Sequence, residues 1–144
     1  MCSSDLGVSA SVTSAMAFAD TALGGVAQPH LLGGAPTACL FNGQFAVGVY
    51  FEANATFKGE ATMVPLTNQS AAAYFVNPQN LEVFVKLVDN CAAGDKVWVF
   101  IAGLTNLRII VTITDMSTGF TRYYINPINT VFRTIVDQTF AFDC

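Results

Sequence analysis

Residues 81–114 read LEVFVKLVDNCAAGDKVWVFIAGLTNLRIIVTIT and contain three apolar segments of strand length. Large apolar side chains recur there at every second position, a period typical of β-strands with one buried face. Residues 89–95, between the first two segments, have the Asp, Asn and Gly content of a turn. This stretch therefore predicts three consecutive antiparallel strands, over residues 81–88, 96–104 and 108–116.

The same alternation continues on both sides of this stretch. We expect further strands over residues 45–49, 56–66, 71–76, 120–125 and 131–136. Asn77-Pro78 and Asn126-Pro127 end two of them, because proline lacks the N–H that a strand ladder needs. Seven or eight short strands, with turn signals about every 8 to 12 residues, predict an all-β, antiparallel, immunoglobulin-like β-sandwich over residues 39–144.

The predicted core consists of the apolar positions on one side of these strands. Truncation of any one of them to alanine is expected to cost about 2–5 kcal/mol. The set is Phe45, Val47, Val49, Leu81, Val83, Val85, Leu87, Val97, Val99, Ile101, Ile109, Val111 and Ile113.

Residues 1–38 differ in composition from the rest, because small residues dominate and no strand period is present. This composition predicts a flexible leader or linker. Residues 1–6, Met-Cys-Ser-Ser-Asp-Leu, match the translation of a common sequencing adapter. We therefore expect the true N-terminus to be missing and Cys2 to be no native cysteine. Ala17-Phe18-Ala19 has the spacing of a signal-peptidase site, with a plain linker as the alternative.

Composition excludes several classes of function. Charged residues make up 11% of the 144 residues, against about 25% in ordinary soluble domains, and the mean hydropathy is +0.50. No window holds the roughly 18 consecutive apolar residues that a membrane-spanning helix requires. The six Lys and Arg residues are scattered singly in a chain of net charge −4, so no basic surface for nucleic acid is expected.

The four cysteines, Cys2, Cys39, Cys91 and Cys144, contain no C-x-x-C pair, and His30 is the only histidine. A structural zinc site would therefore lack ligands. Widely spaced cysteines favour disulfides in an oxidising compartment, and hence a secreted or cell-surface protein. The alternative is a set of free, buried cysteines in a cytosolic protein.

No catalytic residues and no cofactor are predicted. His30 lies outside the strand region, and no nucleophile-elbow motif occurs. Glu52, Glu60 and Glu82 fit a solvated sheet face better than a pair of hydrolytic carboxylates. Asp89 and Asp95 share one loop and are weak calcium candidates, since aspartates are also common turn formers.

A strand period of two places Trp98 and Phe100 opposite the buried side of their strand. Together with Phe84 on the preceding strand, they form a candidate aromatic face for a glycan, another surface protein or a second copy of the chain. The alternative is that residues 7–38 cover this face. Asn54-Ala55-Thr56 and Asn68-Gln69-Ser70 match the N-glycosylation sequon, which matters only in a eukaryotic secretory host.

Blocks between Cys39 and Cys144 resemble an uncharacterised domain of secreted and surface proteins of bacteria. The blocks are residues 39–45 (CLFNGQF), 64–67 (VPLT), 77–86 (NPQNLEVFVK), 97–105 (VWVFIAGLT) and 111–115 (VTITD), followed by Thr118-Gly119, Tyr124 and Asn126-Pro127. The resemblance implies a β-sandwich module, often at the end of a larger exported protein, with no assigned activity. It also implies a Cys91–Cys144 disulfide, and a partner for Cys39 that lies upstream and is lost from this chain.

Two departures from that family occur. Asp89-Asn90 stands where the family has Asp-Gly, and Val49-Tyr50-Phe51 replaces a polar, Arg-containing stretch. The second departure makes this edge more apolar and weakens any inherited binding role. From the sequence we therefore expect a non-catalytic extracellular module for adhesion or accessory binding, with carbohydrate as one ligand class. The alternative is a self-assembling structural subunit of a surface filament or layer.

Overall fold

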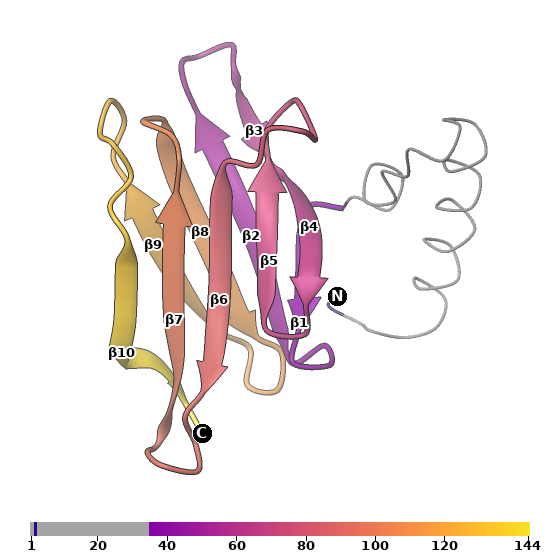
Figure 1. Ribbon diagram of the computed structural model, residues 1–144, viewed down its shortest axis with the longest axis vertical. Helices are drawn as coiled ribbons and strands as arrows, with labels where there is room; N and C mark the ends of the chain where they lie inside the picture. Colours follow the sequence, from indigo (N-terminus) through magenta and orange to yellow (C-terminus); the bar gives the residue numbers. More distant parts are fainter. Residues whose placement is uncertain (1, 3–34) are drawn as a thin grey trace, which may run out of the picture.

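The computed structural model, which describes Cys2 and residues 35–144, consists of two antiparallel β-sheets stacked face to face (Figure 1). Its ten strands are β1 (Thr37–Leu40), β2 (Phe45–Glu52), β3 (Lys58–Glu60), β4 (Thr62–Thr67), β5 (Ser70–Tyr74), β6 (Val83–Asp89), β7 (Lys96–Gly103), β8 (Arg108–Asp115), β9 (Phe120–Asn126) and β10 (Ile135–Asp143). The meander sheet has the order β10-β7-β6-β5-β4. The β2–β8 sheet has the order β1-β2-β8-β9, with β3 also paired to β2.

The all-β class and the two-layer antiparallel architecture are confirmed, but the expected strand number is too low. The single strand predicted over residues 56–66 is two strands, because the chain changes sheets at Ala61. Ala61 is buried, so its small side chain fits between the sheets. The sequence also missed β1, whose four residues follow a region without strand period, and it placed the last strand too early.

The immunoglobulin-like connectivity is not confirmed. Strands β4 to β7 follow one another within the meander sheet. A constant-type immunoglobulin domain places at most two consecutive strands in the same sheet, and a variable-type domain at most three. The chain then crosses to the β2–β8 sheet for β8 and β9, and returns to pair β10 with β7.

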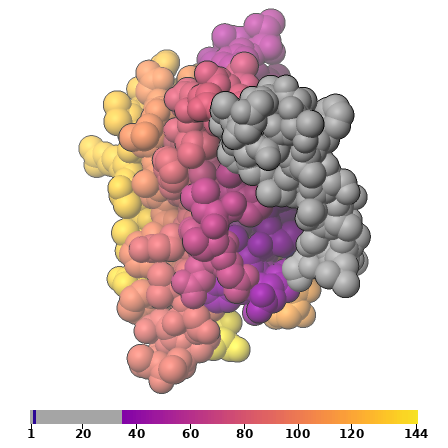
Figure 2. All heavy atoms as spheres, turned by 45° about the vertical axis from the view of Figure 1, so that its right-hand side comes forward, coloured from indigo at the N-terminus to yellow at the C-terminus, as the bar shows by residue number. Residues whose placement is uncertain are grey.

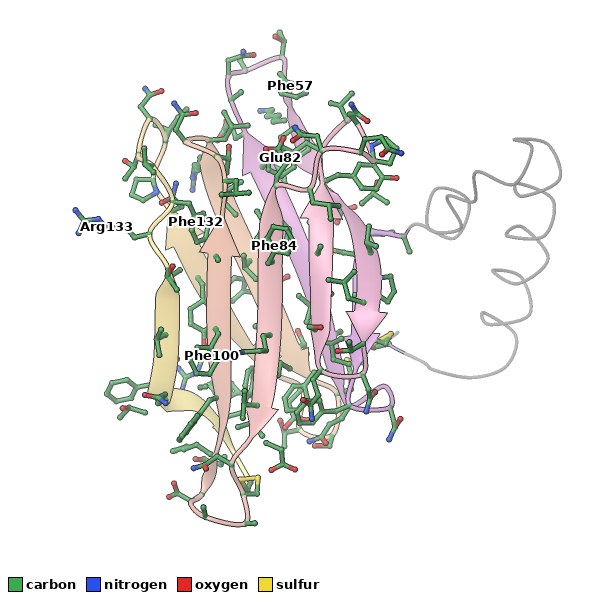
Figure 3. The ribbon with its side chains drawn as sticks, viewed as in Figure 1. Phe57, Glu82, Phe84, Phe100, Phe132 and Arg133 are labelled. Carbon is green, nitrogen blue, oxygen red and sulfur yellow. A yellow bond between two sulfur atoms is a disulfide. The ribbon has the colours of Figure 1, made fainter. Side chains whose placement is uncertain are left out.

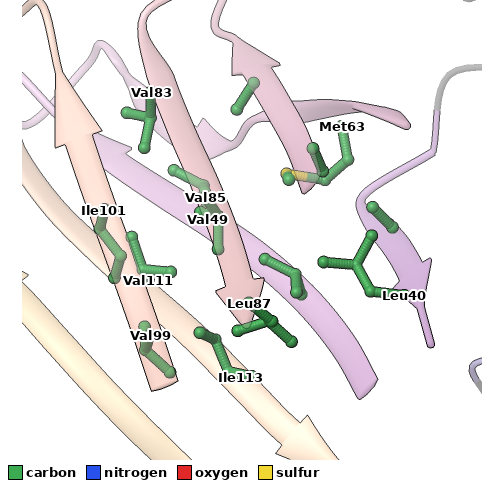
Figure 4. Close-up of a cluster of buried hydrophobic side chains, with 14 of the residues drawn as sticks. Leu40, Val49, Met63, Val83, Val85, Leu87, Val99, Ile101, Val111 and Ile113 are labelled. Carbon is green, nitrogen blue, oxygen red and sulfur yellow. The ribbon is translucent and has the colours of Figure 1, made fainter. Parts of the chain in front are cut away.

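The core lies between the two sheets and is built mainly from the predicted positions (Figure 4). Every predicted core residue is buried except Leu81, which precedes β6 and is only partly buried. Leu81 packs against a small second cluster formed by Val64, Ala72 and Tyr74. Ala141 and Phe142 lie in β10, beyond the end of the strand predicted over residues 131–136, and complete the main core.

Two close contacts fix the connections at one end of the sandwich. Gly103, at the end of β7, lies against the ring of Phe132, which Figure 3 labels. A Cβ atom at Gly103 would lie 2.6 Å from that ring, so glycine is needed for this packing. The buried amide of Asn126 donates hydrogen bonds to the carbonyl oxygens of Leu107 (3.0 Å) and Thr130 (2.7 Å), which holds the β9–β10 connection.

Two disulfides are present, and only one was anticipated. Cys91 pairs with Cys144, as the family resemblance implied. Cys39 pairs with Cys2. The prediction that Cys2 takes no part in a disulfide is therefore wrong, as is the expectation that the partner of Cys39 has been lost. All four cysteines are bonded, which indicates an oxidising environment.

The leader or linker predicted for residues 1–38, including the Ala17-Phe18-Ala19 site and the possible covering role of residues 7–38, lies largely outside the described residues. No helix in the described part of the chain has the length and apolar content needed to cross a membrane.

A titratable pair links β9 to β10 across the corner of the sandwich. The Tyr124 hydroxyl donates a 2.8 Å hydrogen bond to the carboxylate of Asp137. Burial alone would raise the pKa of this carboxyl group, but hydrogen bonds from the N–H of Phe140, the hydroxyl of Tyr124 and the N–H of Thr139 lower it below the ordinary 3.8. Burial and the hydrogen bond to Asp137 raise the pKa of Tyr124.

This pair predicts a loss of stability in acid. The pKa of Asp137 is lower in the folded state than in the unfolded state. Asp137 therefore adds to the free energy of unfolding above about pH 4, and this stabilisation is lost as the pH falls through the folded-state pKa. We expect Tyr124→Phe to reduce this loss, because it removes one of the hydrogen bonds that favour the charged form. Urea unfolding of both proteins at pH 6 and pH 3 measures it. An equal loss in both proteins would contradict the prediction.

Candidate functional site

The three residues predicted to form an aromatic face lie together on the outer side of the meander sheet. Phe84 is on β6, and Trp98 and Phe100 are on β7; their neighbours in sequence alternate into the core. Strands β6 and β7 are paired, with Lys86 opposite Phe100 and Val88 opposite Trp98. Phe84 therefore lies on the strand next to the one that carries the other two aromatic residues. Figure 3 shows Phe84 and Phe100 on these strands. We call Phe84, Trp98 and Phe100 the outer aromatic face.

The rings of the outer aromatic face do not form a flat platform. The centroids of Trp98 and Phe100 are 6.4 Å apart and the ring planes are inclined at 65°. The ammonium group of Lys86 lies 4.7 Å from the centroid of Phe100, a cation–π contact. A ligand that stacks on this side of Phe100 must therefore displace Lys86.

A shallow apolar groove of about 310 Å³ runs beside these rings. Its described lining consists of Leu66, Ser70, Ala71, Phe84, Val85, Lys86, Phe100, Ile101, Ala102 and Thr134. Among these residues Lys86 carries the only charge. Val136, which pairs with Phe100, is 53% exposed, and Leu66 is 51% exposed. Figure 2 shows the atoms of β5, β6 and β7 side by side on one face of the molecule.

The weak calcium candidates have structural partners in the β6–β7 turn. The Asp89 carboxylate accepts a 2.9 Å hydrogen bond from the N–H of Cys91. The backbone carbonyl of Asp95 accepts a 2.9 Å hydrogen bond from the N–H of Cys144. Within the described residues, no three acidic, histidine or cysteine side chains come together as a metal site. Both aspartates therefore act in the turn beside the Cys91–Cys144 disulfide, and calcium binding stays a weak prediction.

No protein-family model matches the chain, and no curated protein or solved structure is significantly similar to it. The resemblance to a bacterial surface domain stays a prediction, supported in its coarser part by the two-sheet antiparallel architecture. The surfaces of the protein itself are therefore the guide to its function.

A second surface feature, which the sequence did not predict, lies on the outer side of the β2–β8 sheet. It is a hollow of about 240 Å³ with Gly48 in its lining, and we call it the Gly48 hollow. Its lining comprises Pro36, Thr37, Ala46, Gly48, Val49, Tyr50, Glu60, Ile110, Thr112 and Thr114. The sequence feature that could have indicated this hollow is a glycine at an outward position, in the middle of a strand that alternates buried and exposed residues.

Proposed function

We propose that this protein is a non-catalytic, extracellular module for adhesion or accessory binding, and that the outer aromatic face is its contact surface. The observation that carries this proposal is the position of Phe84, Trp98 and Phe100 on the outer side of an antiparallel sheet. The outer side of such a sheet is ordinarily polar when it faces water. Aromatic residues at these positions, beside an apolar groove, are typical of a surface that binds a partner.

Carbohydrate is the ligand class that we propose first. One side of a sugar ring carries mainly C–H groups, which pack against aromatic side chains, while its hydroxyls need hydrogen-bonding groups nearby. Ser70, Lys86 and Thr134 line the groove and can supply these groups. The Lys86–Phe100 contact is exposed to solvent, and such contacts are worth about 0.5–1 kcal/mol, so a ligand can displace it at modest cost.

Retention on insoluble polysaccharides tests this proposal, with a broad glycan array for soluble ligands. Trp98 is the only tryptophan, so its fluorescence reports directly on the outer aromatic face. We expect Trp98→Ala or Phe84→Ala to weaken retention about tenfold, equivalent to about 1.4 kcal/mol. Tyr123→Ala is the matched control, because Tyr123 is an exposed aromatic residue of the other sheet. No retention of the unaltered protein and no change in Trp98 fluorescence with any glycan would contradict the proposal.

A second candidate is a self-assembling structural subunit that uses the same face. It is favoured by the single charge in the groove and by the exposed Leu66 and Val136 on its flanks. Light scattering across a concentration series separates the two candidates. Growth into large particles that Lys86→Ala enhances would favour assembly, because this variant removes the charge. A monomer at all concentrations would exclude assembly through this face.

The proposal also includes the cellular location of the protein and its fold classification. The two disulfides support secretion or display on a cell surface. The family resemblance supports a bacterial origin. An immunoglobulin-like classification is supported by the two stacked antiparallel sheets, although the four-strand meander departs from that topology.

A further inference from the structure

We propose that the Gly48 hollow binds a single neutral sugar ring. It lies on the β2–β8 sheet, on the opposite side of the sandwich from the outer aromatic face. The proposal does not depend on the function assigned to the outer aromatic face, because the two surfaces share no lining residue.

The hollow exists because a glycine occupies an outward position in the middle of β2. Gly48 pairs with Thr37 on one side and with Thr112 on the other, in regular ladders without a bulge. Glycine weakens the interior of a strand, and there it often marks a close approach by a ligand or by another part of the backbone. The reason for this glycine therefore needs to be found in its surroundings.

The surroundings of Gly48 leave little room for a larger residue. Its backbone is outside the left-handed region that only glycine adopts easily. An added Cβ atom would lie 3.2 Å from Thr112 Oγ1 and 3.4 Å from the carbonyl oxygen of Pro36. These contacts are tight but would require a shift of only a few tenths of an ångström. Glycine therefore keeps this position free of a side chain, and its surface forms part of the lining of the hollow.

The lining of the hollow combines apolar and hydrogen-bonding groups in the manner that a sugar ring requires. Ala46 and Ile110 provide apolar surface, and Tyr50 provides an aromatic ring. Within the described residues, neither the Tyr50 hydroxyl nor the Glu60 carboxylate makes a hydrogen bond to protein, so both are free to bind a ligand. A carboxylate accepts hydrogen bonds from ligand hydroxyls, and a phenol both donates and accepts.

The threonines add a smaller set of polar contacts. Thr114 is already engaged, because its hydroxyl shares a 2.8 Å hydrogen bond with Thr121. The hydroxyl of Thr112 makes only a long contact of 3.5 Å with the carbonyl oxygen of Gly48. Thr112 can therefore turn toward a ligand at little cost, since a contact of this length is a weak hydrogen bond.

Size and charge narrow the ligand class. A volume of about 240 Å³ lies below the range of roughly 300–1,000 Å³ that is usual for drug-sized ligands, and suits one ring rather than a chain. No lysine or arginine is present among the described lining residues, while Glu60 contributes a negative charge. An anionic ligand such as a phosphate or an acidic sugar would therefore lack a cation to pair with. A neutral pyranose fits both constraints.

NMR titration of the full chain with glucose, galactose, mannose and N-acetylglucosamine tests the proposal. We expect at least one sugar to give saturable amide shifts at Gly48, Tyr50 and Thr112, with a Kd in the millimolar range (about 4 kcal/mol of binding free energy), because the hollow is shallow. No saturable shift at these amides with any of the four sugars would overturn it. Trp98 fluorescence reports separately on the outer aromatic face, so failure of either proposal is distinguishable from failure of the other.

Three variants identify the binding surface. Tyr50→Ala should weaken binding about tenfold, and Gly48→Ala should weaken it several-fold by filling the hollow, with their amide spectra confirming that both fold. Tyr123→Ala is the matched control, because Tyr123 lies on the same sheet face, is 65% exposed and does not line the hollow. It should bind like the unaltered protein. Equal weakening by Tyr50→Ala and Tyr123→Ala, or unchanged binding by Gly48→Ala, would overturn the proposal.

Discussion

Phe45→Ala is expected to lower the free energy of unfolding by about 3–5 kcal/mol, because truncation of a buried phenylalanine leaves a cavity. Phe45 is fully buried at the start of β2. Its ring makes edge-on contacts with Phe41 at 5.3 Å and with Phe142 at 5.1 Å between centroids. It therefore joins the β1–β2 turn to the C-terminal segment. Urea unfolding followed by circular dichroism measures the change.

Two further variants serve as a control and as a milder substitution for Phe45→Ala. Tyr123→Ala removes an aromatic ring that is 65% exposed, and should change the free energy of unfolding by less than about 0.5 kcal/mol. Phe45→Leu keeps most of the buried volume and provides a measurable protein if Phe45→Ala does not fold. A loss below about 1 kcal/mol for Phe45→Ala would show that this ring does not hold the core together.

Removal of the Cys91–Cys144 disulfide by Cys91→Ala and Cys144→Ala is expected to cost about 4 kcal/mol, the chain-entropy value for a closed loop of this length. The bond spans a sequence separation of 53 residues. It fixes the C-terminus beside the β6–β7 turn, where the N–H of Cys144 also bonds to the carbonyl of Asp95 (Figure 1). Thermal and urea unfolding under oxidising conditions measure the loss. Free thiols at Cys91 and Cys144 in protein purified under oxidising conditions would contradict the pairing.

The second disulfide provides an informative comparison. Cys2 and Cys39 are 37 positions apart, so the same chain-entropy argument predicts a similar loss of about 4 kcal/mol for Cys2→Ala with Cys39→Ala. Unfolding of this double variant at the same urea concentration as the unaltered protein would contradict a stabilising Cys2–Cys39 bond. The measurement therefore decides whether Cys2 contributes to the stability of this domain.

The alternation of apolar residues was sufficient to predict the class of the fold and most of its core. Val83, Val85 and Leu87 all face the space between the sheets, because a strand turns successive side chains to opposite sides. The same rule predicted that Trp98 and Phe100 face away from that space. Leu81 was wrongly included because it continues the period of β6, although the strand itself begins at Val83.

Features that depend on distant pairings were not predicted. The change of sheet at Ala61 was not predicted, because it depends on the strands with which β3 and β4 pair. The Cys2–Cys39 pair was excluded on an argument about the origin of the first six residues, which contains no information about proximity. Both depend on which segments meet after folding.

The sequence by itself determined that this chain forms antiparallel strands with one apolar side, since that property belongs to each strand alone. It also determined that aromatic residues lie at outward positions of β6 and β7. The tertiary structure alone decided which strands are neighbours, and hence that Phe84 and Phe100 border one groove. It also created the Gly48 hollow, whose lining comes from four strands and the residue that precedes β1. Position along a strand is local information, whereas a binding surface is a property of strand order and register.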